Sequence, residues 1–209
     1  RALMNSLKLA TLATLVAVPV GTLAAIGLSR AGRGLALASS ALFLAPMVVP
    51  IVVVSVAIYR SALDVSMNGT LLALTLSHAV LALPFVVIVV LARLQTIPTE
   101  LYDAAKVDGA GALRRFRDIT LPQLAEVLAV VIVFRTIWTF NKFEEIYLLT
   151  RGGPGTSTYN LALYALDQSI ANLRMGVGAA AGVIMLLLLL AGSMLYIRVS
   201  GFGREDKAA

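Results

Sequence analysis

Four side chains that could bind a polar solute share one face of an apolar segment late in the chain. They are Arg135, Trp138, Thr139 and Lys142. Their spacing of i, i+3, i+4 and i+7 places them on one side of an α-helix. An arginine at the centre of a membrane span costs roughly 2.5 to 3.5 kcal/mol, so it normally faces a water-filled cavity or a partner group. This face predicts solute binding by charge and by aromatic stacking.

The same face also has structural interpretations, which the sequence leaves open. Arg135 could form an ion pair with Glu126 or with another acid inside a helical bundle. Lys142 lies near the expected end of the helix and could extend its ammonium group to the surface.

A second face with the same spacing lies on an earlier apolar segment. It consists of His78, Leu81, Ala82 and Phe85. His78 is the only histidine of the chain, and a lone histidine in an apolar segment is more often a hydrogen-bonded core residue than a ligand. Both interpretations of His78 remain open.

Enzyme chemistry is excluded by the residues that the chain lacks. It has one histidine and no cysteine, so disulfides, thiol nucleophiles and cysteine metal sites are absent. No Ser/His/Asp set or metal-ligand cluster is available, and no Gly-x4-Gly-Lys-Ser/Thr phosphate loop occurs. We therefore predict no catalytic residue, no metal and no cofactor.

The elements that must position these residues are membrane-spanning helices. The 209 residues are 59% hydrophobic and 13% charged, about half the charged fraction of a soluble domain. A span needs about 20 apolar residues, and only helices or closed barrels satisfy their backbone groups in lipid. Five segments qualify: 8–28, 36–59, 70–92, 121–141 and 174–198. We predict an all-α, polytopic transmembrane bundle forming one domain, 1–209, with a proline kink at Pro46 and Pro50 in the second span.

The distribution of basic residues predicts the orientation. If the loop at 93–120 is cytoplasmic, ten of the 17 basic residues lie inside: Arg30, Arg33, Arg93, Lys106, Arg114, Arg115, Arg117, Arg198, Arg204 and Lys207. Six lie outside: Arg1, Lys8, Arg60, Lys142, Arg151 and Arg174. This excess agrees with the positive-inside rule. It places the C-terminus in the cytoplasm and the loop at 142–173 outside, and it explains the net charge of +6 without a nucleic-acid partner.

The chain would then begin outside the membrane, with Arg1 rather than a methionine. We expect from this that a preceding helix is missing.

The polar loop at 93–120 has the pattern of two helices joined by a glycine. Thr99 can cap the first helix, whose first turn holds Glu100 and Asp103, favourable charges at the positive end of its dipole. Gly109 allows the chain to turn without steric cost. The loop could dock into another protein or lie on the inner leaflet as an amphipathic helix. The fixed spacing of Gly109 from its flanking motifs favours docking into a protein.

Residues 97–165 resemble the maltose-type and glycerol-phosphate-type carbohydrate-uptake permeases of ABC importers. The resemblance lies in Asp108-Gly109-Ala110, Ile119-Thr120-Leu121-Pro122, the run Phe-Asn-Lys-Phe-Glu-Glu-Ile-Tyr at 140–147 and the run Leu-Thr-Arg-Gly-Gly-Pro at 149–154. It implies that the loop docks into a groove of an ATPase subunit. The coupling residues would be Glu100, Asp103, Ala104, Ala105, Asp108, Gly109, Ala110, Ile119, Leu121 and Pro122.

The resemblance also implies the rest of the assembly. We expect a second permease subunit, two ATP-binding subunits and an extracytoplasmic solute-binding protein, in lipid of the prokaryotic inner membrane. ATP hydrolysis would belong to the separate subunits. The two faces described above match positions from which such permeases contact sugar.

The resemblance leaves the class of substrate open. Aromatic and amide side chains dominate the sugar-contacting positions of these permeases, whereas Arg135, Lys142 and His78 stand there in this chain. We therefore expect an anionic solute, such as a sugar phosphate or an acidic sugar. Asp103 stands where glutamate is usual, and residues 83–87 also resemble polyamine-type permeases.

Two other classes of function remain as alternatives. One is a polyamine or other small-solute ABC permease. The other is an ATP-independent secondary transporter, which inverted repeats and paired broken helices would support. Neither feature is evident in the sequence.

Overall fold

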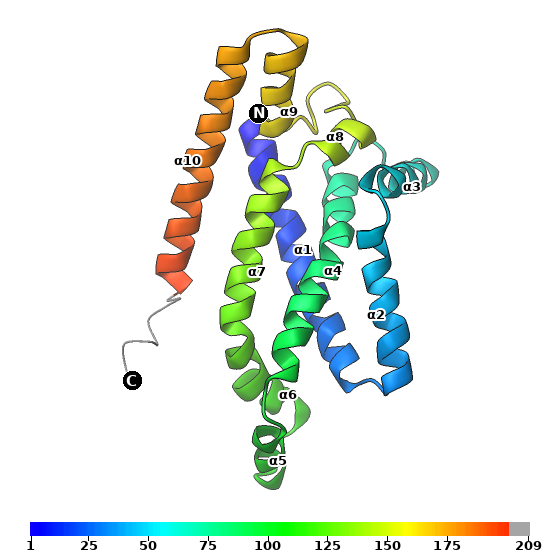
Figure 1. Ribbon diagram of the computed structural model, residues 1–209, viewed down its shortest axis with the longest axis vertical. Coiled ribbons are helices and arrows are strands. Elements are labelled where there is room, and N and C mark those ends of the chain that lie inside the picture. Colours follow the sequence, from blue (N-terminus) through cyan, green and yellow to red (C-terminus); the bar gives the residue numbers. More distant parts are fainter. Residues whose placement is uncertain (201–209) are drawn as a thin grey trace.

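The computed structural model describes residues 1–200, with side chains throughout that range except at positions 33, 35–40 and 44. Within it the chain is helical and contains no strand. Four helices are long and apolar enough to cross a membrane: α1 (Ala2–Arg30), α4 (Leu71–Gln95), the helical run Ala112–Asn141 that contains α7 (Leu121–Asn141), and α10 (Met175–Ser200). The predicted all-α transmembrane bundle is confirmed (Figure 1). The predicted cytoplasmic C-terminus lies outside the described residues.

The predicted span over 36–59, in which a proline kink was expected, is sharply broken. The segment folds as α2 (Arg33–Val48) and α3 (Ile51–Asp64), and the two helices are bent by 109° at the break between them. Val49 and Pro50 adopt extended backbone angles at the break. Proline lacks the N–H that would continue the helix and biases the residue before it toward extended angles. The proline effect was expected, but it breaks the helix instead of kinking it.

The centre of the bundle is the close packing of α1 against α4, which cross side by side in Figure 1. Ala17 of α1 and Ala79 and Ala82 of α4 form a buried cluster. One turn along, Gly21 faces Val86. Helices in lipid gain nothing from expelling water between them, so small residues that allow close van der Waals contact hold them together.

Short helices occupy the two ends of the bundle. At the end where α4 finishes, α5 (Thr99–Val107) and α6 (Ala112–Arg115) precede a π-helical turn, Phe116–Thr120, that runs into α7. At the other end are α8 (Glu144–Leu149), α9 (Leu161–Leu166) and a second π-helical turn, Asp167–Ala171. Figure 1 shows α5 and α6 at the lower end of the bundle and α8 and α9 at its upper end. Thr99 is the first helical residue, not the cap as expected, because α5 begins after Pro98.

The loop at 142–173 is fastened to the first turns of α1. The side-chain amide of Asn5 lies 3.0–3.1 Å from the carbonyl oxygens of Thr156, Ser157 and Tyr159. The N–H of Leu161 donates to the hydroxyl of Ser6 at 2.9 Å. These contacts join segments more than 150 residues apart in the sequence.

A tyrosine of the same loop is tied within the loop itself. The hydroxyl of Tyr159 donates to the carboxylate of Asp167 at 2.5 Å. Burial, together with this bond, raises the pKa of Tyr159, so its hydroxyl keeps the proton that it donates.

Replacing Gly21 tests the packing of α1 on α4. A Cβ at Gly21 would lie 2.6 Å from Cγ1 and 2.8 Å from Cβ of Val86, a β-branched side chain that cannot swing away. We expect Gly21→Ala to lower the free energy of unfolding by about 1 to 3 kcal/mol, the range for overpacking. Thermal unfolding in detergent measures the effect. Gly27→Ala is the control, since nothing lies within 4 Å of a Cβ on that residue of the same helix; equal effects of both changes would contradict the packing argument.

Candidate functional site

A cavity of about 510 Å³ opens between α4, α7 and the break that joins α2 to α3. Six of the eight predicted solute-contacting residues line it: His78, Leu81, Phe85, Arg135, Trp138 and Lys142. The other two, Ala82 and Thr139, are buried but are not among its lining residues. Residues 46–51 form the wall across from them. The break in the second predicted span therefore shapes this cavity.

Aromatic rings from both helices form one continuous side of the cavity. Phe85 of α4 stacks on Phe134 of α7 with ring centres 4.9 Å apart, and Phe134 lies 5.5 Å from the ring of Trp138. The ammonium group of Lys142 lies over Trp138, 5.6 Å from the ring centre. Ring faces next to a cation are suited to the apolar face and polar edge of a sugar. Phe134 was not predicted, although its i, i+4 spacing from Trp138 was a signal.

The acidic residue that offsets positive charge in the cavity is Glu145, which was not predicted from the sequence. One carboxylate oxygen of Glu145 lies 3.3 Å from the ammonium nitrogen of Lys142, and the Glu145 side chain is only 3% exposed. Glu144 also approaches Lys142, at 3.8 Å, but is 45% exposed.

Arg135 has less negative charge close to it than Lys142, the other cation of the site. Among the described residues it has no ion pair within 4.0 Å, although it is only 8% exposed. Glu126, the acid considered from the sequence, is on the exposed surface. The cavity therefore combines two cations with one anion.

Two buried polar atoms of the cavity residues have no partner among the described residues: Nε2 of His78 and Oε2 of Glu145. The other ring nitrogen of His78 lies 2.9 Å from the carbonyl oxygen of Leu74. Because a carbonyl only accepts, that nitrogen carries the hydrogen in the neutral ring. Nε2 of His78 is then an acceptor, and a buried polar atom without a partner favours a ligand or water that supplies one.

The helix–glycine–helix segment, residues 99–115, lies at the far end of α4 and α7 from the loop 142–173. Gly109 has a φ of +73° between α5 and α6, an angle that glycine adopts at little cost. Neither α5 nor α6 has a buried residue, and the apolar side chains of Val107 and Leu113 are 88% and 80% exposed. Apolar side chains exposed beside a sharp turn suit docking against another protein.

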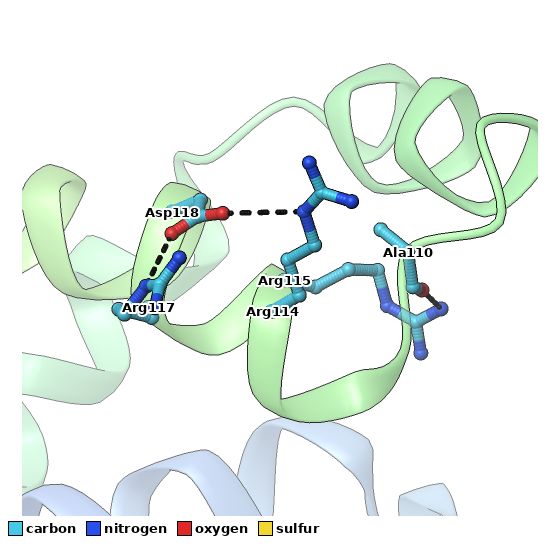
Figure 2. Close-up of polar contacts among 5 residues, drawn as sticks. All are labelled: Ala110, Arg114, Arg115, Arg117 and Asp118. Carbon is cyan, nitrogen blue, oxygen red and sulfur yellow. Dashed lines mark hydrogen bonds and ion pairs between the residues drawn. The ribbon is translucent and has the colours of Figure 1, made fainter.

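Polar contacts hold the shape of this segment. Figure 2 shows Arg114 and Arg117 reaching Asp118, at 3.6 and 2.7 Å, and Arg115 turning the other way. Nη1 of Arg115 donates to the carbonyl oxygen of Ala110 at 3.0 Å, which fixes the chain just after Gly109 (Figure 2). At the base of the segment, Nε of Arg93 donates to the carbonyl oxygen of Gln123 at 3.0 Å and joins α4 to α7.

Of the predicted coupling residues, Glu100, Asp103 and Ala104 are exposed on α5, and Ala105 is partly covered. The turn contributes Asp108 and Gly109, which are exposed, and Ala110, which is half-buried. Ile119, Leu121 and Pro122 continue into α7. Within the described residues, no group of three or more His, Cys, Asp or Glu side chains could hold a metal.

Residues 17–200 match the model of a family described as the binding-protein-dependent transport system inner membrane component. The chain belongs to this family. It is therefore a membrane-spanning, multi-pass permease component of the inner membrane, and its class is not itself catalytic.

Three similar proteins have names that refer to the transport of sugars or sugar derivatives. It is 45% identical over 115 residues to the sulfoquinovosyl glycerol permease SmoG of Agrobacterium fabrum, covering 55% of this chain and 37% of that one. It is 42% identical over 123 residues to the trehalose/maltose permease MalF of Thermococcus litoralis, covering 58% and 41%. It is 36% identical over 153 residues to the diacetylchitobiose permease DasB of Streptomyces coelicolor, covering 71% and 47%. The chain thus spans less than half the length of these relatives.

Solved structures share the fold. A bacterial ABC transporter that imports the acidic polysaccharide alginate matches with a TM-score of 0.82 at 23% identity, covering 96% of this chain and 78% of that chain. An inward-facing MetNI methionine ABC transporter matches with a TM-score of 0.73 at 19% identity, covering 96% and 94%. The arrangement of helices is therefore that of ABC-transporter membrane subunits.

Removing Glu145 tests whether it balances the charges of the cavity. We expect Glu145→Gln to destabilise the protein by on the order of 2 kcal/mol, less than the 3 to 5 kcal/mol of a fully buried pair, because Lys142 is 21% exposed. The double change with Lys142→Gln should cost less than the sum of the single changes. Thermal unfolding of the four proteins in detergent provides the comparison. Glu144→Gln is the exposed control, and a loss as large as that of Glu145→Gln would refute the assignment.

Proposed function

We propose that the chain is the permease subunit of an ATP-driven importer and passes a sugar or sugar-like solute delivered by an external binding protein. The observation that supports this most is the cavity between α4 and α7, where stacked aromatic rings lie beside buried charges. Its walls belong to the two helices that end at the exposed helix–glycine–helix segment. A movement of that segment would therefore reach both walls of the cavity directly.

The sugar-like nature of the solute has two supports. The relatives carry names of sugar transport: sulfoquinovosyl glycerol, trehalose/maltose and diacetylchitobiose. The cavity itself offers Phe85, Phe134 and Trp138 as stacking surfaces. It also offers unpartnered polar atoms on His78 and Glu145, which can bind hydroxyl groups.

Within this class we favour a solute that carries negative charge. Arg135 is buried and has no ion pair among the described residues, whereas Lys142 shares its charge with Glu145. An anionic group would supply the missing counter-charge of Arg135. The polyamine alternative is disfavoured, because Arg135 and Lys142 together outnumber the single acid of the cavity lining.

The partners follow from the exposed segment and from the family. Coupling would place Glu100, Asp103, Ala104, Ala105, Asp108, Gly109, Ala110, Ile119, Leu121 and Pro122 against one of two ATPase subunits, which would hydrolyse the ATP. A second permease subunit would complete the path, and a solute-binding protein would dock at the loop 142–173. This arrangement puts the C-terminus in the cytoplasm and treats 1–209 as one transmembrane domain.

A secondary transporter is the weaker alternative. One broken helix pair, α2 with α3, does occur, but such transporters pair it with a second broken helix in an inverted repeat. The helices of the described part of the chain include no second pair of that kind. Membership in a binding-protein-dependent family also argues for an ATP-driven importer.

Transport by Arg135→Ala tests the charge of the solute. In proteoliposomes with the whole importer, we expect uptake of an acidic disaccharide to fall at least about tenfold, since a charge-assisted contact is worth roughly 1.5 to 3 kcal/mol. Uptake of maltose should change much less. Arg135→Lys keeps the charge and should restore most uptake of the acidic sugar. Equal losses for the two sugars would sink the charge argument.

The turn at Gly109 tests the coupling assignment. Valine at a φ of +73° is strained, although nothing lies within 4 Å of an added Cβ. We expect Gly109→Val to reduce co-purification of the ATPase and solute-dependent ATP hydrolysis severalfold. Gly111→Val is the matched control, because Gly111 has a φ of −65° and equally open surroundings. If both variants keep the ATPase bound and active, the turn is not the coupling element.

A further inference from the structure

A second cavity, of about 490 Å³, lies at the opposite end of the spans from the loop 142–173. It is enclosed by the last turns of α1 and α4 and by the segment from α5 to the start of α7. No residue of this cavity lines the solute cavity described above. It is therefore a separate site.

The polar wall of this cavity is basic. Arg30, Lys106 and Arg115 line it, together with Ser29, Tyr102 and Thr120, and its lining contains no acidic side chain. The hydroxyl of Ser29 already donates to the carbonyl oxygen of Ile26, and those of Tyr102 and Thr120 are bonded to each other, which leaves one of these two with a hydrogen to donate. The guanidinium and ammonium groups are therefore the main donors to an anionic oxygen. The chemistry of the wall fits a phosphate group.

The three cations differ in how many bonds their charged groups already make within the protein. Lys106 is paired with Asp103 at 2.7 Å, and Arg115 gives one N–H to the carbonyl oxygen of Ala110. Arg30 has no ion pair among the described residues. Most donors of Arg30 and Arg115 are thus available to a ligand.

Figure 2 shows why Arg115 differs from its neighbours. Arg114 and Arg117 point to Asp118, whose single charge offsets one of theirs, and neither lines the cavity. Arg115 extends in the other direction, toward Ala110. The three arginines of one short segment therefore form two groups, one paired with Asp118 and one facing the cavity.

The other wall is apolar and lies where the spans α1 and α4 end. Ile26, Leu94 and Ile97 line it, and they belong to the last turns of α1 and α4 or follow them directly. The phosphate groups of a bilayer lie just beyond its core of about 30 Å, where spanning helices end. A ligand with an apolar part toward the core and a phosphate beyond it matches both walls.

We propose that this cavity binds the headgroup phosphate of an anionic phospholipid, with Arg30 and Arg115 as its main ligands. Basic pockets between helix ends on the cytoplasmic side are known to hold such headgroups. A lipid there would bridge α1 to the helix–glycine–helix segment. The inference does not depend on the identity of the transported solute.

Lipid binding to the complete, detergent-purified importer tests the proposal by native mass spectrometry with phosphatidylglycerol. At roughly 1 kcal/mol per basic residue near the membrane, each lost arginine should weaken binding about fivefold, so Arg30→Gln with Arg115→Gln should weaken it about 25-fold. The matched control, Arg114→Gln with Arg117→Gln, removes the same charge outside the cavity and should weaken binding much less, because neither side chain lines the cavity and both are paired with Asp118. Arg30→Lys with Arg115→Lys keeps the charge and should retain most of the binding. Phosphatidylcholine should bind weakly to every protein.

Four results would overturn the proposal. Equal weakening in the glutamine pair and in its control would mean that surface charge alone attracts the lipid. Displacement of phosphatidylglycerol by millimolar inorganic phosphate would identify a free anion as the ligand. Loss of the ATPase subunit from the glutamine variant, with lipid retained, would show that the cavity seats a protein partner. Absence of bound phosphatidylglycerol in the unaltered importer would exclude a lipid site.

Discussion

The contact between α1 and α4 supports every functional feature of this permease. Because lipid is as apolar as the helices, these two spans are held by close van der Waals contact, which requires Gly21 and the alanines around it. α4 presents His78 and Phe85 to the cavity between α4 and α7 and continues into the helix–glycine–helix segment. α1 contributes Arg30 to the basic cavity at its end. Small residues at the centre thus fix the positions of charged residues at both ends.

Much of this arrangement could be predicted from the sequence because it depends on local rules. The lengths of the apolar segments predicted α1, α4, α7 and α10. Helical spacing grouped eight candidate residues, and six of them line one cavity. The turn at Gly109 followed from the freedom of glycine, and its φ of +73° confirms it. The coupling and solute-binding roles of these residues remain predictions.

The features that were missed depend on tertiary packing. Glu145 follows Lys142 at a spacing of i, i+3, but α7 ends at Asn141, so the spacing alone did not place Glu145 on the face of Arg135 and Lys142. Its burial depends on the fold of α8. The break between α2 and α3 needed two consecutive extended residues, which a proline permits but does not require. Helical spacing identifies the residues that share a face, but it does not show which of them border a cavity. Ala82 and Thr139 were therefore grouped with residues whose cavity they do not line.

The fastening of the 142–173 loop limits how this end of the bundle could open. Asn5 and Ser6 hold Thr156, Ser157, Tyr159 and Leu161 through four hydrogen-bond contacts. A flap that opens alone would have to break all of them at once. The loop is better described as a stiff cap that tilts together with α1. Because α1 is packed on α4, such a tilt would also move the helix that continues into the helix–glycine–helix segment at the other end.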